Sequence, residues 1–422
     1  MRILHISETD YEGGAGKAAH TLHCALRRMG GESFFLAECV QSNAPYTFSI
    51  SGLRGLPAKV LRRIRSSLDL FPLRRYPLRR PAAWSVGRLP RKLPSLIRRL
   101  RPDIIHLHWI SQALSIRAIG RLPGPIVWTH HDWGAFTGGC RCPVDCRRFT
   151  TGCGECPLLG SQRSDDLSHR VCQRKQRYWQ RSRIHSVAVG SGIANDIGDS
   201  LILGHHPCTV IPNGIDTDIF RPLDRLQARA SLGLNPHEFI FLFGAFTVNT
   251  PLKGGNLLAD ALSLWGRQNP SLPARLVTVG RGSISGTPPS MPVTALGLIS
   301  NPGQMARIYA AADVVVVPSR IESLGLMAAE AQACGVPVVA FGETGARDIV
   351  IHMETGFLPK SWDAEAFAEG LDWAANLSAD ARRRIAMNSA KNIHDKSSLK
   401  TIVDAHITLY RQLLSDATAK AR

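Results

Sequence analysis

The stretch Val314–Phe341, VVVVPSRIESLGLMAAEAQACGVPVVAF, decides the fold of this chain. Its four consecutive valines, followed by Pro-Ser, predict a strand that is buried on both faces. A second β-branched run after Gly335 predicts a neighbouring strand, and the small residues between the two runs predict a helix. The stretch therefore predicts one strand-helix-strand unit of a parallel sheet. In such sheets ligands bind at the carboxyl ends of the strands, where the loop 319–324 lies.

Two carboxylates flank the start of the predicted helix. Glu322 lies in the loop, and Glu330 lies about two turns into the helix. The first N–H groups of a helix have no partner inside it, so they suit a phosphate group. The residues concerned are Ser323, Leu324, Gly325 and Leu326. Carboxylates beside such a site suit the hydroxyl groups of a sugar and a ribose, although both glutamates could instead be solvated charges of a helix surface.

The pattern E-S-L-G-L-x-x-x-E, preceded by P-S and followed by A-C-G-V-P-V-V-A, resembles the E-x7-E signature of retaining glycosyltransferases of family GT4. The resemblance implies an α/β protein of the GT-B fold, with two doubly wound Rossmann-like domains facing across a cleft. It implies transfer of a sugar from a nucleotide sugar to an acceptor hydroxyl, without a metal cofactor in catalysis. Glu330 would hold the ribose and Glu322 the donor sugar. Leu324 departs from the family, which usually has Phe there.

Length and composition agree with a two-domain protein. The chain has 422 residues, 44% of them hydrophobic, and it lacks the roughly 18 uninterrupted apolar residues of a membrane span. We expect residues 1–200 to form an acceptor-side domain and residues 201–395 a nucleotide-sugar domain. Residues 396–422 should form a helix that packs back on the first domain, as the resemblance implies. Met1 leads directly into the predicted strand MRILHIS, so we expect a cytoplasmic protein.

The formal net charge of +18 is concentrated in one segment. Residues 59–101 contain 14 Lys and Arg side chains and a single acid, Asp69, with Leu, Phe and Tyr between the arginine pairs. This composition predicts a surface for an anionic membrane or an anionic acceptor, at the inner face of the cytoplasmic membrane. A merely solvated basic face is the alternative. Nucleic acid is disfavoured, because five prolines prevent one continuous recognition helix.

A glycine-rich segment follows the first predicted strand. Gly13, Gly14, Ala15 and Gly16 predict a loop before a helix, which would form a second anion cradle. The segment lacks the glycine spacing of a P-loop and of a dinucleotide fingerprint. The resemblance implies that Gly14 and Gly16 approach the phosphate of the donor.

The stretch THHDWGAFTGGC, residues 129–140, is similar to bacterial exopolysaccharide glycosyltransferases of the colanic-acid type. The resemblance implies that His131 is the active-site histidine that contacts the donor sugar, with Asp132 and Trp133 on the acceptor side. His130 would be its buried neighbour. Adjacent residues of a strand point to opposite sides, so these side chains could supply one chelating pair at most.

Four cysteines, Cys140, Cys146, Cys153 and Cys156, follow in the pattern C-x5-C-x6-C-x2-C. In a reducing compartment the thiols stay reduced, which favours a metal site over a disulfide. Four thiolates complete a tetrahedral shell, so the metal would be a structural zinc ion. Reduced packing cysteines and a redox role stay open. Cys142 is a fifth cysteine that could compete as a ligand.

Lys253 lies between a predicted strand and the next helix, where it could neutralise a phosphate leaving group. The family has an Arg and a Lys in this region, and Lys253-Gly254 matches its K-G. Ala245 follows Gly244 where many members have the Arg, so Arg281 is the candidate substitute.

These features predict a retaining, hexosyltransferase-type enzyme that uses a nucleotide-sugar donor and a glycan or lipid-linked acceptor, in exopolysaccharide or capsule synthesis. Two alternatives stay open. One is a non-catalytic, polyanion- or membrane-binding zinc protein with a degenerate sugar-nucleotide site, and the other is a GT-B epimerase that acts on the nucleotide sugar alone.

Overall fold

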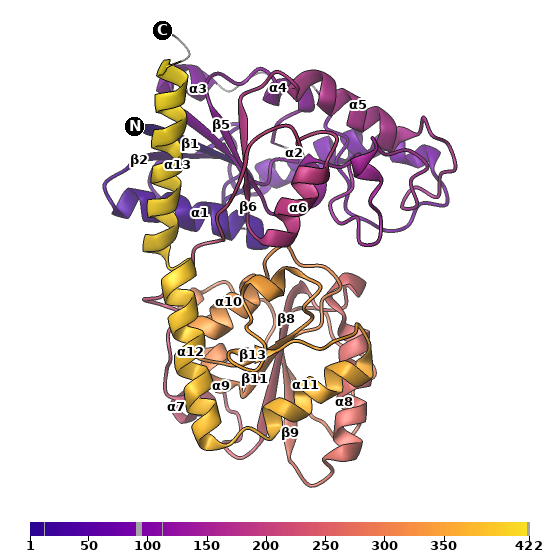
Figure 1. Ribbon diagram of the computed structural model, residues 1–422, viewed down its shortest axis with the longest axis vertical. Coiled ribbons are helices and arrows are strands. Elements are labelled where there is room, and N and C mark those ends of the chain that lie inside the picture. Colours follow the sequence, from indigo (N-terminus) through magenta and orange to yellow (C-terminus); the bar gives the residue numbers. More distant parts are fainter. Residues whose placement is uncertain (12, 90–94, 112, 420–422) are drawn as a thin grey trace. The chain divides into compact units, whose positions relative to one another are not determined.

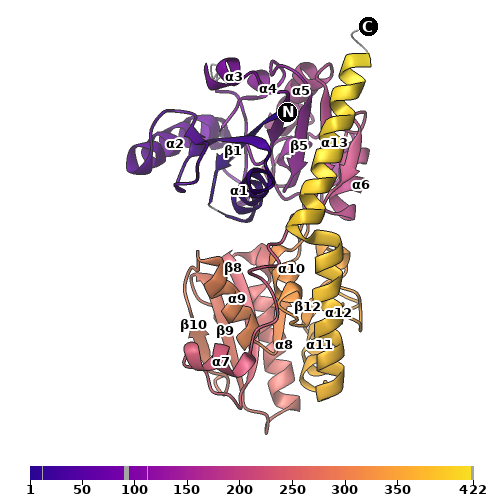
Figure 2. The same cartoon turned by 90° about the vertical axis from the view of Figure 1, so that its left-hand side faces the viewer.

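The computed structural model describes residues 1–11, 13–89, 95–111 and 113–419 (Figure 1). The chain divides into two compact units, the first made of Met1–Pro212 with Ile402–Arg422 and the second of Asn213–Thr401. Each unit has its own parallel sheet with helices on both faces (Figure 2). Both units therefore have the doubly wound α/β architecture that the sequence predicts.

Within its described residues, the first unit has a seven-stranded sheet in the order β3-β2-β1-β4-β5-β6-β7. The strands are β1 (Arg2–Thr9), β2 (Glu32–Cys39), β3 (Thr47–Ser49), β4 (Ile104–Leu107), β5 (Ile126–His130), β6 (Ile184–Ala188) and β7 (Cys208–Val210). The strand order reverses at β1, which lies between β2 and β4, with His5 opposite His106 in the register. In doubly wound sheets the ligand crevice lies at the carboxyl ends of the strands at such a reversal.

The helices of the first unit are α1 (Gly13–Arg28), α2 (Gly55–Leu70), α3 (Ser95–Leu100), α4 (Ile116–Ile119), α5 (Leu167–Trp179), α6 (Ser191–Asp199) and α13 (Leu399–Ala419). Helices α1 and α13 cover the sheet face that carries His5 and His106. On the other face α5 packs Trp179 edge-on against Trp128, with ring centroids 5.1 Å apart.

The boundary between the units lies later than expected. Residues from 201 onward were expected in the second domain, but 208–210 form β7, which pairs with β6 at the edge of the first sheet. Because that pairing holds the chain in the first unit up to Pro212, the expected boundary at residue 200 is too early. The chain rejoins the first unit at Ile402, three residues into α13.

Within its described residues, the second unit has a six-stranded sheet in the order β10-β9-β8-β11-β12-β13. The strands are β8 (Phe239–Thr247), β9 (Ala274–Arg281), β10 (Val293–Ala295), β11 (Val314–Val317), β12 (Val338–Ala340) and β13 (Gly356–Phe357). The four valines of the opening stretch form β11, fully buried as predicted. The strand order reverses between β8 and β11, so the loops after these two strands lie at the expected ligand edge.

Six helices are described in the second unit: α7 (Arg225–Ser231), α8 (Gly255–Gln268), α9 (Pro302–Ala311), α10 (Leu326–Ala333), α11 (Ala364–Ala375) and α12 (Ala379–Ser397). Helices α8 and α11 cover one face, where Phe241, Trp265 and Phe367 belong to one buried apolar cluster. Burial of such large apolar side chains is the main stabilising term of this unit.

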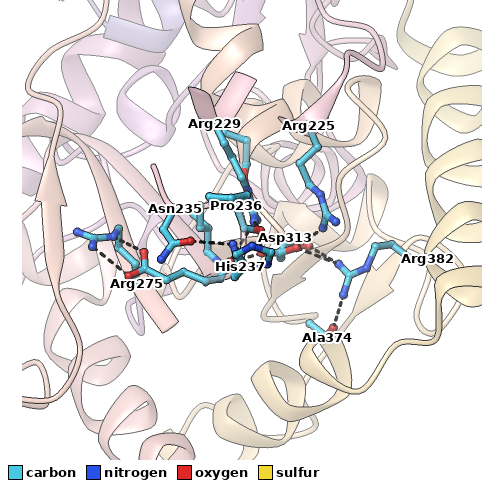
Figure 3. Close-up of polar contacts among 12 residues, drawn as sticks. Arg225, Arg229, Asn235, Pro236, His237, Arg275, Asp313, Ala374 and Arg382 are labelled. Carbon is cyan, nitrogen blue, oxygen red and sulfur yellow. Dashed lines mark hydrogen bonds and ion pairs between the residues drawn. The ribbon is translucent and has the colours of Figure 1, made fainter. Parts of the chain in front are cut away.

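A buried charge cluster fastens the amino end of the second sheet (Figure 3). The carboxylate of Asp313, just before β11, accepts hydrogen bonds from Arg225 and Arg229 at 2.5 Å and from the N–H of Ile240 at 2.7 Å. Arg382 of α12 approaches the same carboxylate at 3.7 Å. Because these partners come from α7, β8 and α12, one carboxylate ties two helices to the sheet at the point where β8 and β11 lie side by side.

Candidate functional site

Two loops of the second unit meet after β8 and β11. Gly254 has φ 74°, and a Cβ at this position would lie 2.0 Å from the carbonyl oxygen of Pro318. The N–H of Arg320 donates to the carbonyl of Leu252 at 3.0 Å. Only glycine permits this approach, so Gly254 lets the loop that carries Lys253 lie against the loop that carries Glu322.

The predicted phosphate-binding lysine and sugar-binding glutamate are paired. Lys253 Nζ donates to Glu322 Oε1 at 2.6 Å, and their side chains are 34% and 15% exposed. The pair is accessible from solvent, so its charges are available to a ligand. A diphosphate at this edge would compete with Glu322 for the ammonium group and would free the carboxylate to accept hydrogen bonds from hydroxyl groups.

The start of α10 is shaped by two glycines. Gly325 is the N-cap with φ 90°, and the N–H of Gly345 donates to the carbonyl of Glu322 at 2.9 Å. A Cβ on Gly345 would lie 2.5 Å from the backbone of Ser323, so this glycine supports the loop from behind. The side chain of Leu324 is buried, which leaves only its backbone available to a ligand. Sequence reasoning missed Gly345, which lies outside the quoted motif.

Glu330 is held by a buried tyrosine of α9. The hydroxyl of Tyr309 donates to Glu330 Oε2 at 2.7 Å, and Tyr309 is only 1% exposed. Burial and the neighbouring carboxylate raise the pKa of Tyr309 well above its ordinary value, so it stays a hydrogen-bond donor. Tyr309 therefore fixes the orientation of Glu330. No sequence pattern singled it out.

Arg281, the candidate substitute for the missing arginine, ends β9. Its guanidinium group lies over the ring of Phe246, 5.0 Å from the ring centroid, and Phe246 is 42% exposed. Phe246 belongs to the last residues of β8, so Arg281 lies at the ligand edge of the sheet. The structure pairs it with this aromatic ring.

The glycine-rich segment of the first unit differs from the prediction. Gly13 opens α1, so Gly14 and Gly16 belong to the first turn of a helix, whereas a separate loop was expected. A Cβ on Gly16 would lie 2.6 Å from Thr9 Oγ1 and 3.1 Å from the carbonyl oxygen of Thr9. Gly16 therefore serves close packing of α1 on β1, whereas Gly14 is exposed.

A row of histidines runs from His5, in the middle of β1, to His108 and His131, which directly follow β4 and β5. His131 Nε2 lies 3.3 Å from His108 Nδ1, and His108 Nε2 lies 3.0 Å from His5 Nδ1. Burial, followed by the neighbouring His406, lowers the pKa of His131 to about 4, so its ring is neutral near pH 7. His130 is buried, as predicted, and bonds Ser186 Oγ at 3.1 Å. His5 and His108 were missed because their separation in sequence hides their contact.

A pocket lies beside this row, lined by His108, Trp109, His131, Asp132 and Lys175 among others. The indole N–H of Trp109 donates to Asp132 Oδ2 at 3.1 Å. The predicted acceptor-side residue Trp133 is instead buried, and its indole N–H donates to Asp196 at 2.7 Å. Trp109 therefore lines this pocket, whereas Trp133 does not.

Lys175 is a buried cation at the base of the same pocket. Its ammonium group donates to the carbonyl oxygens of Gly134 and Thr137, at 2.5 and 2.8 Å. Burial lowers the pKa of Lys175 to about 8, against the opposing effect of nearby thiols and Asp132. The lysine holds the loop after β5 and was not singled out from sequence.

The four predicted zinc ligands share one small pocket, lined by Cys140, Cys146, Cys153 and Cys156 but not by Cys142. Among the described residues, the one group of three or more metal-binding side chains whose donor atoms all lie within 4.8 Å of one another is His5, His106 and His108. No three of the four thiols therefore lie that close together. Sulfur atoms in a tetrahedral zinc site lie about 3.8 Å apart, given zinc–sulfur bonds of about 2.3 Å. The donor set suits zinc, but the loop would have to contract to bind it. Cys153 instead hydrogen-bonds Cys172 of α5, a cysteine that the sequence pattern left out.

The buried histidines predict that acid destabilises the first unit. Burial lowers the pKa of His130 to about 3 and that of His406 to about 4, from 6.5. Below about pH 6.5 these histidines bind protons in the unfolded chain but stay neutral in the folded unit, so the free energy of unfolding falls as pH falls. For His406 the loss reaches at most about 3 kcal/mol near pH 4.

This prediction is measured by chemical denaturation between about pH 7 and pH 5 at constant ionic strength. The pH dependence should weaken in His406→Gln and stay unchanged in His394→Gln, because the His394 side chain is 71% exposed. A denaturation midpoint that is flat over this range in the unmutated protein would contradict it.

Comparisons with known proteins give concordant matches. The family model described as Glycosyltransferase Family 4 matches residues 12–219, and the model described as Glycosyl transferases group 1 matches residues 237–376. A D-inositol 3-phosphate glycosyltransferase of Frankia alni is 32% identical over 306 residues, which cover 67% of this chain and 70% of that protein. A protein of the same name from Segniliparus rotundus is 39% identical over 217 residues, 49% of this chain and 47% of that protein. The chain thus spans about half the length of the latter relative.

Solved structures match nearly the whole chain. Sucrose-phosphate synthase of Thermosynechococcus elongatus has a TM-score of 0.69 at 20% identity, covering 99% of this chain and 100% of that one. Anabaena HepE in complex with UDP and glucose has a TM-score of 0.61 at 17% identity, covering 97% and 99%. At these identities the likeness establishes the fold.

Proposed function

The chain belongs to the family 4, or group 1, glycosyltransferases of GT-B fold, and from this membership we propose that it transfers a sugar from a nucleotide-sugar donor to an acceptor hydroxyl with retention of configuration. The observation that carries the proposal is the Lys253–Glu322 pair at the strand-order reversal of the second sheet, next to the start of α10. A cation, a helix start and a carboxylate together suit a diphosphate with a sugar attached to it.

In this proposal the residues of the second unit bind the donor. Lys253 and the first N–H groups of α10 stabilise the negative charge that grows on the diphosphate as the glycosidic bond breaks. Glu322 accepts hydrogen bonds from the sugar hydroxyls, and Glu330, oriented by Tyr309, accepts them from the ribose. Arg281 is a further candidate for the phosphate. The leaving phosphate takes the proton of the acceptor hydroxyl.

The acceptor has two candidate classes. The pocket that Trp109 and Asp132 line in the first unit is the proposed acceptor side, whereas His131, which also lines it, is proposed to contact the donor sugar. A glycan or lipid-linked acceptor of polysaccharide synthesis is the first class. Relatives named as D-inositol 3-phosphate glycosyltransferases favour a phosphorylated cyclitol as the second class. Transfer assays with both acceptor types separate the two.

The test begins with a mass-spectrometric screen of nucleotide sugars for a donor. Calorimetry with that donor should show roughly tenfold weaker binding by Glu330→Gln, because a hydrogen bond to a charged group is replaced by a neutral one. Glu369→Gln on the exposed side of α11 is the matched control. Unchanged affinity of Glu330→Gln would refute its ribose role. Turnover without acceptor would indicate an epimerase, and no turnover with any donor would indicate a binding module.

We propose that α2 contacts an anionic membrane. Leu56, Val60, Ile64 and Leu68 recur every four residues on this helix and are 73%, 50%, 53% and 52% exposed. Lys59 and Arg63 of the same helix are also exposed, and exposed apolar and basic side chains together are the pattern of helices that lie in a bilayer interface. Residues 90–94 of the basic segment lie outside the described residues. In the described part of the chain, no helix is both long and apolar enough to cross a bilayer.

Flotation with anionic and neutral vesicles measures this contact. Ile64→Ser should lower partition into anionic vesicles about tenfold, because an apolar side chain that would be buried in the interface is lost. Met387→Ser is the control, since Met387 is 67% exposed on α12 of the second unit. Equal partition of the unmutated protein into neutral and anionic vesicles would count against a role of the basic segment in membrane binding.

We also propose that the cysteine loop holds a structural zinc ion, with Cys140, Cys146, Cys153 and Cys156 as ligands. Their common pocket supports this set over one that includes Cys142. Zinc would draw the thiolates together and fix the loop after β5, and it would take no part in sugar transfer.

A further inference from the structure

Three histidine rings, one from the middle of β1 and two from just after β4 and β5, form one hydrogen-bonded row that ends at His131. His5 lies in β1, His108 just after β4 and His131 just after β5. The contacts are 3.0 Å from His5 Nδ1 to His108 Nε2 and 3.3 Å from His108 Nδ1 to His131 Nε2. Successive rings are nearly parallel, at 20° and 25°.

Each contact in the row contains one proton, so neutral rings have two consistent arrangements. In the first, all three hydrogens are on Nδ1, and each ring donates toward His131. In the second, all three hydrogens are on Nε2, and each ring donates toward His5. The two arrangements differ in what His131 offers to a ligand, because they exchange its N–H donor and its lone pair.

The buried end of the row selects between them. His5 Nε2 is buried without a hydrogen-bond partner among the described residues. The second arrangement would leave an N–H group there with no acceptor, whereas the first leaves only a lone pair. Orphaned buried N–H groups are the rarer of the two defects in proteins.

His406, in the same core, provides a reference. Its Nδ1 lies 2.8 Å from the carbonyl oxygen of Ile402, and a carbonyl can only accept, so Nδ1 carries the hydrogen. Its Nε2 is then a bare lone pair, and it too is buried without a partner. The core thus already contains one buried histidine, His406, whose Nε2 has no hydrogen and no partner. The first arrangement places the same kind of nitrogen at His5.

We propose that His5 and His108 are positioning residues that hold His131 in its Nδ1–H tautomer. The inference rests on the proposed function in one respect, the contact between His131 and the donor sugar. Because Nε2 accepts from His108, His131 offers its ligand a hydrogen-bond donor, suited to a hydroxyl oxygen. It cannot take a proton from the acceptor through Nε2, so it is no general base.

A metal ion would exclude this arrangement. His5, His106 and His108 have donor atoms within 4.8 Å of one another, which is the spacing of a candidate cation site. Both ring nitrogens of His106 already contact hydroxyl groups, Tyr410 at 2.6 Å and Thr129 at 2.7 Å. A cation between His5 and His108 would also need the lone pair on His5 Nδ1, where the row has a proton.

Side-chain NMR of the full chain with isotope-labelled histidine reads the tautomers directly, since a ring nitrogen that bears hydrogen differs in shift from one with a lone pair. His131→Gln assigns the His131 signals. We expect the His131 hydrogen on Nδ1, and we expect it to move to Nε2 in His108→Leu. His406 should keep its hydrogen on Nδ1 in both proteins and thereby reports an intact core.

A matched pair of variants at His5 gives a second, independent test if His108→Leu does not fold. Asn places an amide N–H near the position of Nδ1, so His5→Asn should keep the His131 tautomer, whereas His5→Leu should shift it toward Nε2–H. A hydrogen on His131 Nε2 in the unmutated protein, an unchanged tautomer in both leucine variants, or His5 and His108 signals altered by a chelator would overturn the proposal.

The kinetic readout is separate from the spectra. His108→Leu should lower kcat by about two- to tenfold, because one hydrogen bond to the sugar is lost, without weakening nucleotide binding. If no sugar transfer is found with any donor, the proposed function fails, but the tautomer measurement still decides the role of His5 and His108.

Discussion

Lys253→Ala should lower kcat for sugar transfer by about 100- to 1,000-fold, the usual effect of removing one group that stabilises transition-state charge. Its ammonium group donates to Glu322 at 2.6 Å, and a diphosphate would take over that donor. Charge on the diphosphate increases as the glycosidic bond lengthens, so the lysine binds the transition state more tightly than the ground state. Steady-state kinetics with the identified donor measure the effect.

Two variants control for indirect effects. Lys391→Ala removes an exposed lysine that pairs with Asp395 on α12, and it should leave kcat unchanged. Lys253→Arg keeps the charge with a different shape, so it should retain part of the activity. A kcat of Lys253→Ala within threefold of the unmutated value would remove Lys253 from the proposed mechanism and point to Arg281 as the phosphate ligand.

Asp313→Ala should destabilise the second unit by about 3–5 kcal/mol, because it leaves buried arginine charge without its counterion. The Arg229 side chain is 2% exposed, and its other acceptors are carbonyl oxygens of Pro236, Glu238 and Ala311 (Figure 3). The substitution also removes the acceptor of the Ile240 N–H, at the point where β8 and β11 begin to pair. Stability and not chemistry should suffer, since Asp313 lies at the opposite end of the strands from Lys253.

Chemical denaturation combined with amide hydrogen exchange in β8 and β11 assigns the loss to the second unit. Asp380→Ala is the matched control, because Asp380 pairs with Arg383 on the surface, where such pairs contribute about 0–1 kcal/mol. Asp313→Asn keeps the shape and one acceptor oxygen, so it should fall between the two. A loss below 1 kcal/mol for Asp313→Ala would mean that solvent or neighbouring carbonyls compensate the arginines.

The proposed donor-binding residues could be singled out from the sequence because their signals are local. Glu322, Gly325 and Glu330 are close in sequence, and one loop and one helix fix their spacing. Lys253 was recognisable from the strand, glycine and helix around it. The partners of these residues were not predictable: Tyr309 orients Glu330 from another helix, and Gly345 supports the loop from another strand end.

The aromatic residue that lines the pocket of the first unit was not predictable, for the same physical reason. Trp133 and Trp109 are both aromatic residues next to strand ends, and only packing decides which one is buried against Asp196 and which one lines the pocket. The glycine-rich segment was correctly placed between a strand and a helix. Its role in packing against Thr9 depends on how closely α1 approaches β1, which composition does not specify.

The sequence by itself determined that this chain alternates strands and helices in two parallel α/β units, and it singled out the motif that we propose to bind the donor. Apolar periodicity and glycine positions carry that information within short windows. Only the tertiary structure decided that Asp313 gathers three arginines, that α2 exposes its apolar stripe, and that His5 and His108 reach His131. Such contacts depend on strand order and register, which bring together residues that are far apart in the sequence, such as His5 and His108. The opening stretch Val314–Phe341 therefore specified its own strand and helix, while its neighbours in space gave its two glutamates their partners.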